Sequence, residues 1–213
     1  MNFWGLALGK NHKDQSKERR FHGRLRRKVA TREVRQRFLV VCEGERTEPA
    51  YFEAFQVPGL VVRVEGVGVS NLRLIEEARH KQARDDYDQV WCVFDRDDCE
   101  VDHIHRAIEQ AQLLGYGIAF SNQAFELWYL LHFHYQWTAM SRSDYCERLS
   151  KCLGDEYQKN RPGIYLQLES RQEAALRNAQ RLYEQYDPWE PASSDPSTTV
   201  HWLVEELNKH RRP

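Results

Sequence analysis

The strongest chemical signal in the sequence is a set of carboxylates that follow apolar runs. Phe38–Cys42 and Val90–Phe94 are continuous apolar stretches without polar alternation, which is typical of strands buried on both faces of a parallel sheet. Glu43 follows the first stretch, and Asp95 and Asp97 follow the second. Because side chains alternate along an extended segment, Asp95 and Asp97 are expected on the same side of it. Two carboxylates so placed repel each other unless a cation, a proton or an arginine lies between them.

These three acids could converge on one or two divalent cations. The carboxyl ends of parallel strands share the sheet edge where open α/β sheets bind ligands, and neighbouring strands lie about 5 Å apart. Carboxylates with water and phosphate oxygens suit Mg²⁺ or Mn²⁺. Gly44 permits a tight turn and a close approach of phosphate to the backbone. The competing interpretation is a polar turn, because Asp is common where strands end.

Two further acids could join this site. Glu48 lies in a helix expected from about Thr47, whose amino terminus would favour anions. Glu126 is the one charged residue in an otherwise apolar stretch, Phe125–Leu131, and would need a partner if buried. Each has two interpretations: a ligand of a second metal, or an acid in the first turn of a helix satisfied by solvent or by the helix dipole.

The elements that must position these acids alternate along the chain. Strands are expected at 38–42, 60–64, 90–94 and 116–120, with helices at 47–55, 71–83, 102–114 and 124–134. The later pattern is helical only, at 143–152, 171–186 and 199–209, with a loop at 187–198. This order predicts an α/β fold with a mainly parallel four-stranded sheet flanked by helices. The expected organisation is an N-terminal arm (1–37), an α/β core (38–135) and a helical extension (136–213).

The N-terminal arm is strongly basic. Lys10 to Arg37 contains twelve Lys or Arg residues and three acids, whereas the whole chain has a net charge of −1. A basic arm on an acidic body is expected of a protein that binds a polyanion, although a solvated tail would also explain it. The side chains predicted to contact nucleic acid are Arg24, Arg26, Arg27, Lys28, Arg35, Arg37 and, beyond the arm, Lys159.

Composition limits the other classes of function. No apolar run approaches the roughly 18 residues that a membrane span needs. The five cysteines show no CxxC spacing, so they are interpreted as reduced core thiols of a cytoplasmic protein. The sequence contains no GxxxxGK[ST] motif, so any ATPase required for activity would be a separate chain.

Longer blocks of the sequence resemble a known family. Glu43-Gly44 after one strand, with Asp95-x-Asp97 after a later one, resembles the TOPRIM domain of topoisomerases, primases and OLD-type nucleases. More narrowly, the blocks VCEGERTEPAYF (41–52) and SNQAFELWYLLHF (121–133) are similar to the RloB-like family, and the resemblance extends from about residue 37 to 207. One departure is Gln123-Ala124, where Pro-Cys is expected in this family.

The resemblance implies a TOPRIM-like fold, a place in prokaryotic defence or restriction-linked loci, and metal-dependent cleavage of nucleic acid. By this resemblance Glu43, Asp95 and Asp97 match the TOPRIM catalytic acids. Glu126 resembles the extra acid that OLD-type nucleases place after the sheet.

The leading hypothesis is therefore a Mg²⁺- or Mn²⁺-dependent endonuclease that acts on RNA such as tRNA, or else on DNA. Asp95 and Asp97 would hold metal, Glu43 would bridge metals or act as general base, and Glu126 and Glu48 would complete a second metal site. An activator, a homodimer partner or a separate defence-system ATPase could be required. The alternatives are a non-catalytic nucleic-acid-binding or signalling module, and a metal-free ribonuclease that uses histidines.

Overall fold

The computed structural model describes residues 35–55, 57, 59–97 and 99–211. These residues belong to one compact unit that begins at Glu33. Most of the basic arm, with the predicted contacts at Arg24, Arg26, Arg27 and Lys28, lies outside the described residues.

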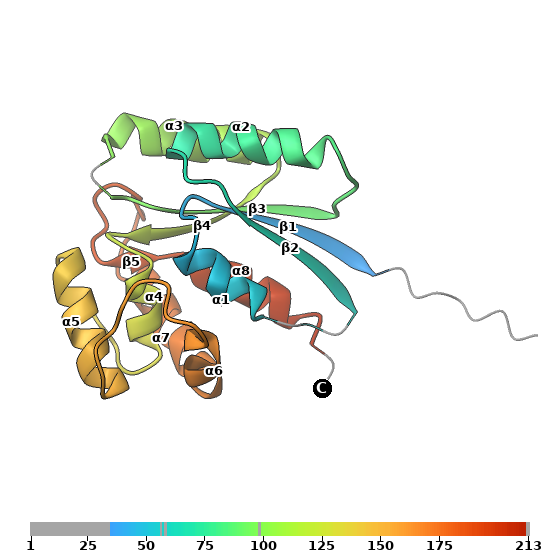
Figure 1. Cartoon of the computed structure of the whole chain (residues 1–213). Helices are drawn as coiled ribbons and strands as arrows, with labels where there is room; N and C mark the ends of the chain where they lie inside the picture. The colour runs from blue at the N-terminus through green and yellow to red at the C-terminus, as the bar shows by residue number, and fades with distance from the viewer. Residues whose placement is uncertain (1–34, 56, 58, 98, 212–213) are drawn as a thin grey trace, which may run out of the picture. The chain divides into compact units, whose positions relative to one another are not determined.

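A five-stranded sheet in the order β2-β1-β3-β4-β5 forms the centre of this unit (Figure 1). Its strands are β1 (Gln36–Cys42), β2 (Leu60–Gly66), β3 (Gln89–Asp95), β4 (Gly117–Asn122) and β5 (Ser197–Thr198). The first four pair in parallel, and β5 pairs antiparallel with β4. The mainly parallel sheet flanked by helices is thus confirmed, but the prediction of four strands is wrong by one. The fifth strand has two residues, too few to show a hydrophobic period.

Eight α-helices complete the described part of the chain. They are α1 (Thr47–Glu53), α2 (Asn71–Gln82), α3 (Val101–Leu113), α4 (Glu126–Leu131), α5 (Arg142–Leu153), α6 (Ile164–Leu168), α7 (Gln172–Tyr183) and α8 (Val200–Asn208). The short helix α6 and the 3-10 turn Glu169–Arg171 that follows it were not predicted. The helix predicted at 124–134 is confined to the six residues of α4.

The sheet buries a separate hydrophobic core on each face. Along β1, Val40 belongs to the core that contains Trp128 of α4, whereas Val41 belongs to the core that contains Leu74 of α2 and Ile104 of α3. Accordingly α2 and α3 lie over one face, and α1, α4 and α8 lie over the other (Figure 1). This two-sided burial explains why the central strands are apolar without alternation.

The predicted C-terminal helical extension also completes the sheet. It supplies β5, and the hydroxyl of Thr199 accepts a hydrogen bond from the backbone N–H of Phe120 in β4 at 2.9 Å. The Thr198 hydroxyl bonds that of Ser121 at 3.1 Å. The end of β4, which leads into α4, is therefore fixed by residues almost 80 positions later in the chain.

Candidate active site

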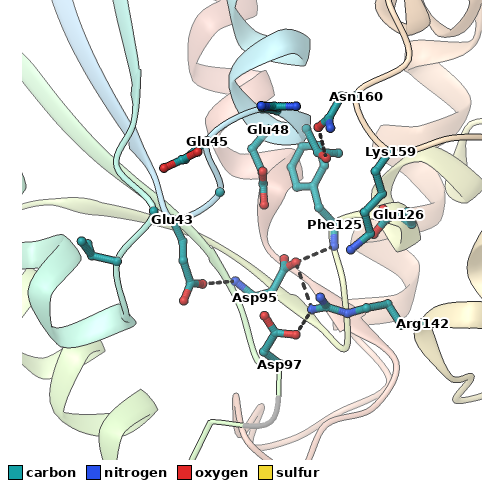
Figure 2. Close-up of a pocket in the computed structure, with 15 residues that line it drawn as sticks. Glu43, Glu45, Glu48, Asp95, Asp97, Phe125, Glu126, Arg142, Lys159 and Asn160 are labelled. Carbon is teal, nitrogen blue, oxygen red and sulfur yellow. Dashed lines mark hydrogen bonds and ion pairs between the residues drawn. The ribbon is translucent and has the colours of Figure 1, made fainter.

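A cleft of about 510 Å³ opens at the carboxyl ends of β1 and β3. Its lining comes from these strand ends, the loop after β2, the starts of α1, α4 and α5, and the loop after α5 (Figure 2). Its charged side chains are six carboxylates, Glu43, Glu45, Glu48, Asp95, Asp97 and Glu126, and three basic groups, Arg46, Arg142 and Lys159. The structure thus brings all five predicted acids and Lys159 to one cleft.

Strand register places Glu43 beside Asp95. Cys42 lies opposite Val93 in the β1–β3 pairing, and the backbone N–H of Glu43 donates to the Val93 carbonyl at 2.8 Å. The carboxylate of Glu43 in turn accepts a hydrogen bond from the backbone N–H of Asp95 at 3.2 Å. Burial raises the pKa of Glu43 to about 7. A carboxyl group that titrates near neutral pH suits proton transfer.

Asp95 is buried, with only 8% of its surface exposed. Its Oδ2 accepts a hydrogen bond from the backbone N–H of Phe125 at 3.1 Å. Its Oδ1 is buried and has no hydrogen-bond partner among the described residues. Burial, with the charges of Glu48 and Glu126, raises the pKa of Asp95 well above its usual range. A buried carboxylate oxygen without a partner is costly unless a ligand satisfies it.

An arginine lies between the two acids of the Asp95-x-Asp97 motif. Nη2 of Arg142 lies 3.8 Å from Oδ2 of Asp95 and forms an ion pair with Oδ1 of Asp97 (Figure 2). The two carboxylates therefore lie on the same side, as predicted, and share one cationic group. Arg142 was not among the predicted site residues.

Glu48 projects from α1 over Gly44 and is buried. A Cβ atom placed on Gly44 would lie 2.3 Å from Oε2 of Glu48, so glycine is what lets this carboxylate approach the turn. Burial and the charge of Glu126 raise the pKa of Glu48. Thr47 is the first residue of α1, where the helix was expected to begin, and its hydroxyl donates to the side-chain oxygen of Asn160 at 3.2 Å.

Glu126 is the first residue of α4 and is almost fully buried. Its Oε1 accepts a hydrogen bond from the hydroxyl of Tyr157 at 3.2 Å. Glu126 thus has the partner that its burial requires, and it lines the same cleft as Asp95. Tyr157 could not be predicted, because it lies 31 residues away in a loop without a motif.

The chain matches one known family model over most of its length. The RloB-like protein family model matches residues 38–207, most of the chain. The chain belongs to the RloB-like family. Within this RloB-like chain the match includes all five predicted acids and Arg142. No curated protein and no solved structure matches it significantly.

The remaining predicted basic contacts of the RloB-like chain lie elsewhere. Arg37 is near the amino end of β1, at the opposite end of the strand from Glu43. Its guanidinium pairs with both carboxylate oxygens of Asp85 and lies over the ring of Tyr87, 5.2 Å from the ring centre. Arg35 is exposed just before β1. Contact of Arg35 and Arg37 with nucleic acid stays a prediction, and it would require a ligand that extends beyond the cleft.

Histidines do not contribute to the described lining of the cleft. His132 is buried, its Nδ1 lies 2.9 Å from the carbonyl oxygen of Trp128, and burial lowers its pKa to about 4. Burial likewise lowers the pKa of His201 to about 4. Both side chains are interpreted as neutral core residues of the RloB-like fold, so nothing in the described cleft supports a histidine-based ribonuclease.

The cleft of the RloB-like chain has the right donors for a divalent cation. Carboxylate oxygens are the ligands that Mg²⁺ and Mn²⁺ prefer, and the buried Oδ1 of Asp95 has no other partner among the described residues. As the side chains stand, no three His, Cys, Asp or Glu residues within the described part are grouped closely enough to hold a metal ion. Metal binding would therefore require side-chain rearrangement, and Arg142 is the group that stands between Asp95 and Asp97. In the same described part, no helix is long and apolar enough to span a bilayer.

Proposed function

We propose that this RloB-like protein is a Mg²⁺- or Mn²⁺-dependent endonuclease that cleaves RNA such as tRNA, or else DNA. The observation that carries the proposal is the buried Asp95, which has an unpartnered oxygen in a cleft lined by six carboxylates. A concave site with convergent acids of raised pKa is typical of catalytic centres. The family resemblance adds the TOPRIM-like character and the role in prokaryotic defence, and the interpretation of the cysteines as reduced thiols adds the cytoplasmic location.

Each acid has a role that its position supports. Asp95 and Asp97 would hold the metal, and Glu48 and Glu126 would complete a second metal site. When bound, the metal would polarise the scissile phosphate and lower the pKa of an attacking water. Glu43 would accept the proton of that water, because its pKa of about 7 balances basicity against ionisation at neutral pH.

Lys159 and the basic segment before β1 would neutralise substrate phosphates. The open cleft has lysine on the wall opposite Glu43 (Figure 2), and phosphate neutralisation by Lys and Arg supplies most of the non-specific affinity for nucleic acids. Cleavage in the cell could further depend on a second copy of the chain, an ATPase or another defence-system protein.

A second candidate function is a non-catalytic nucleic-acid-binding module. The observation that favours it is Arg142, whose guanidinium occupies the space between Asp95 and Asp97. A protein without metal chemistry could keep the acid pair neutralised in this way.

The test is cleavage of labelled tRNA, single-stranded RNA and DNA substrates in Mg²⁺ or Mn²⁺, and in EDTA. We expect metal-dependent products that fall about 100-fold or more in Asp95→Asn and Glu43→Gln. Glu173→Gln, on the exposed face of α7, serves as the matched control and should cleave like wild type. Products that persist in EDTA and in both variants would refute the acid–metal mechanism, whereas salt-sensitive binding without cleavage would favour the binding module.

A further inference from the structure

Arg142 is the first residue of α5, but the stability of this helix does not depend on an arginine at that position. Ser141 caps α5 by accepting a hydrogen bond from the Asp144 N–H at 3.2 Å, and the Asp144 carboxylate accepts one from the Ser141 N–H at 3.1 Å. This capping box already satisfies the end of the helix. A cation in the first turn is also unfavourable, because the helix dipole is positive at that end. Helix stability therefore does not account for an arginine at this position.

The guanidinium of Arg142 is used in the cleft instead. Its Nη2 meets the carboxylates of both Asp95 and Asp97, and its side chain remains 33% exposed. These contacts neutralise an acid pair whose inner member is buried. A divalent cation held by Asp95 and Asp97 would reduce the same repulsion between the two carboxylates that this one nitrogen reduces.

We propose that Arg142 is an exchangeable internal cation, which pairs with Asp95 and Asp97 while the metal is absent and binds a substrate phosphate once the metal has taken its place. The inference rests on the proposed function, since it concerns the same acids. A divalent ion carries twice the charge of a guanidinium and displaces it from the carboxylates. The planar fork of Arg then suits phosphate oxygens, and its partial exposure allows it to turn into the cleft.

This role gives Arg142 opposite effects on two ligands. Its removal abolishes competition for Asp95 and Asp97, so metal should bind more tightly. The same removal takes away a group that binds phosphate, so nucleic acid should bind more weakly. A purely structural role in holding α5 against the sheet would weaken both.

The experiment compares wild type, Arg142→Gln and the matched control Arg46→Gln. Arg46 lines the same cleft and forms no ion pair with Asp95 or Asp97 within the described residues. Mn²⁺ affinity is measured by calorimetry without substrate. Affinity for fluorescein-labelled single-stranded 20-mers of RNA and DNA is measured with Ca²⁺, over a range of salt concentrations.

We expect Arg142→Gln to bind Mn²⁺ about tenfold more tightly, a coupling of ordinary size for two linked ligands. It should bind the oligonucleotides about tenfold more weakly, with a salt slope lower by about one. Arg46→Gln should change the Mn²⁺ affinity by no more than about twofold, because it leaves the acid pair intact. Unchanged or weaker Mn²⁺ binding in Arg142→Gln would overturn the proposal, as would a parallel loss of both affinities.

Two results separate this inference from the proposed nuclease function. Opposite changes in Mn²⁺ and oligonucleotide affinity, without cleavage of any substrate by wild type, would uphold the exchange and refute the nuclease. Cleavage that depends on the acids, together with a Mn²⁺ affinity that does not depend on Arg142, would uphold the nuclease and refute the exchange. If Arg142→Gln does not fold, Arg142→Lys decides: weaker oligonucleotide binding at undiminished Mn²⁺ affinity supports the exchange, and weaker Mn²⁺ binding overturns it.

Discussion

At the scale of single residues, the raised pKa of Glu43 makes the stability of the metal-free protein depend on pH. Its pKa is about 7 in the folded protein, against an ordinary value of 4.5. Between these values the unfolded chain ionises Glu43 while the folded protein keeps it protonated, so stability falls as pH rises and levels off above about pH 7. Burial also raises the pKa of Glu48 and that of Asp95.

We therefore expect the free energy of unfolding in EDTA to fall by roughly 2 kcal/mol or more between pH 4.5 and pH 7, allowing for solvent screening at the half-buried Glu43. Glu43→Gln should reduce this dependence, because the amide does not titrate, and should leave the part that comes from Glu48 and Asp95. The measurement is urea denaturation at a series of pH values, with Glu173→Gln as a control that keeps the wild-type slope. An equal slope in Glu43→Gln would show that Glu43 titrates normally.

The close approach of Glu48 to Gly44 leaves no space for a side chain at residue 44. Gly44→Ala should cost about 1–2 kcal/mol, because the new Cβ would lie 2.3 Å from Oε2 of Glu48. If that close approach is the cause, the cost should shrink in a Glu48→Ala background, which is measurable as a double-mutant cycle by urea denaturation. If the losses of stability from the two substitutions are additive, the cost of Gly44→Ala arises from the backbone of the turn instead.

The acids of the cleft could be predicted from sequence, and the groups that neutralise them could not. Glu43, Asp95 and Asp97 directly follow apolar runs, so strand alternation and parallel register fix their common edge. Arg142 reaches the cleft from α5, and Tyr157 reaches the Glu126 carboxylate from a loop. No local sequence pattern specifies that either segment returns to this edge of the sheet. The Ser141-x-x-Asp144 cap signature could have placed the start of α5, but not the direction of the Arg142 side chain.

At the scale of elements, the cap of α5 positions a cleft residue. Ser141→Ala should cost about 1 kcal/mol through loss of the capping box. The matched control is Ser70→Ala at the start of α2, a helix of the same length, where the serine makes no side-chain cap hydrogen bond. Urea denaturation should show a smaller loss of stability for Ser70→Ala. Equal losses at Ser141 and Ser70 would mean that the cap contributes little.

Element boundaries were less predictable than element order. The apolar runs revealed the four parallel strands because each is buried by helices on both sides. β5 has only Ser197 and Thr198, and hydrogen bonds to β4 rather than hydrophobic burial hold it in place. The helix predicted at 124–134 is shorter in the structure, where it comprises only α4. The apolar stretch Phe125–Leu131 is buried by tertiary packing, and this burial extends beyond the helical residues.

Over the whole molecule, positive charge is concentrated in the sequence before Glu33, while carboxylates dominate the cleft. Ten of the twelve Lys and Arg residues between Lys10 and Arg37 precede Glu33, where the compact unit begins. A cleft with more acids than bases repels phosphates, and the proposed metal would offset this repulsion. Encounter with nucleic acid should therefore depend on the basic segment, and chemistry on the cleft.

Removal of residues 1–32 should separate these two contributions. We expect the truncated chain to keep its melting temperature within a few degrees and its Mn²⁺ affinity within about twofold, because the acids and their partners all lie in the remaining unit. Its affinity for nucleic acid should fall, and its salt slope should drop by about 0.7–0.9 for each phosphate that the protein no longer neutralises. Oligonucleotide binding between 50 and 200 mM salt, roughly the range over which such interactions weaken most visibly, measures both.

A full-length variant with Arg24, Arg26, Arg27 and Lys28 changed to Gln controls for chain length and should reproduce part of the lower slope. An unchanged slope in both proteins would locate phosphate binding within the folded unit and leave the basic segment without this role.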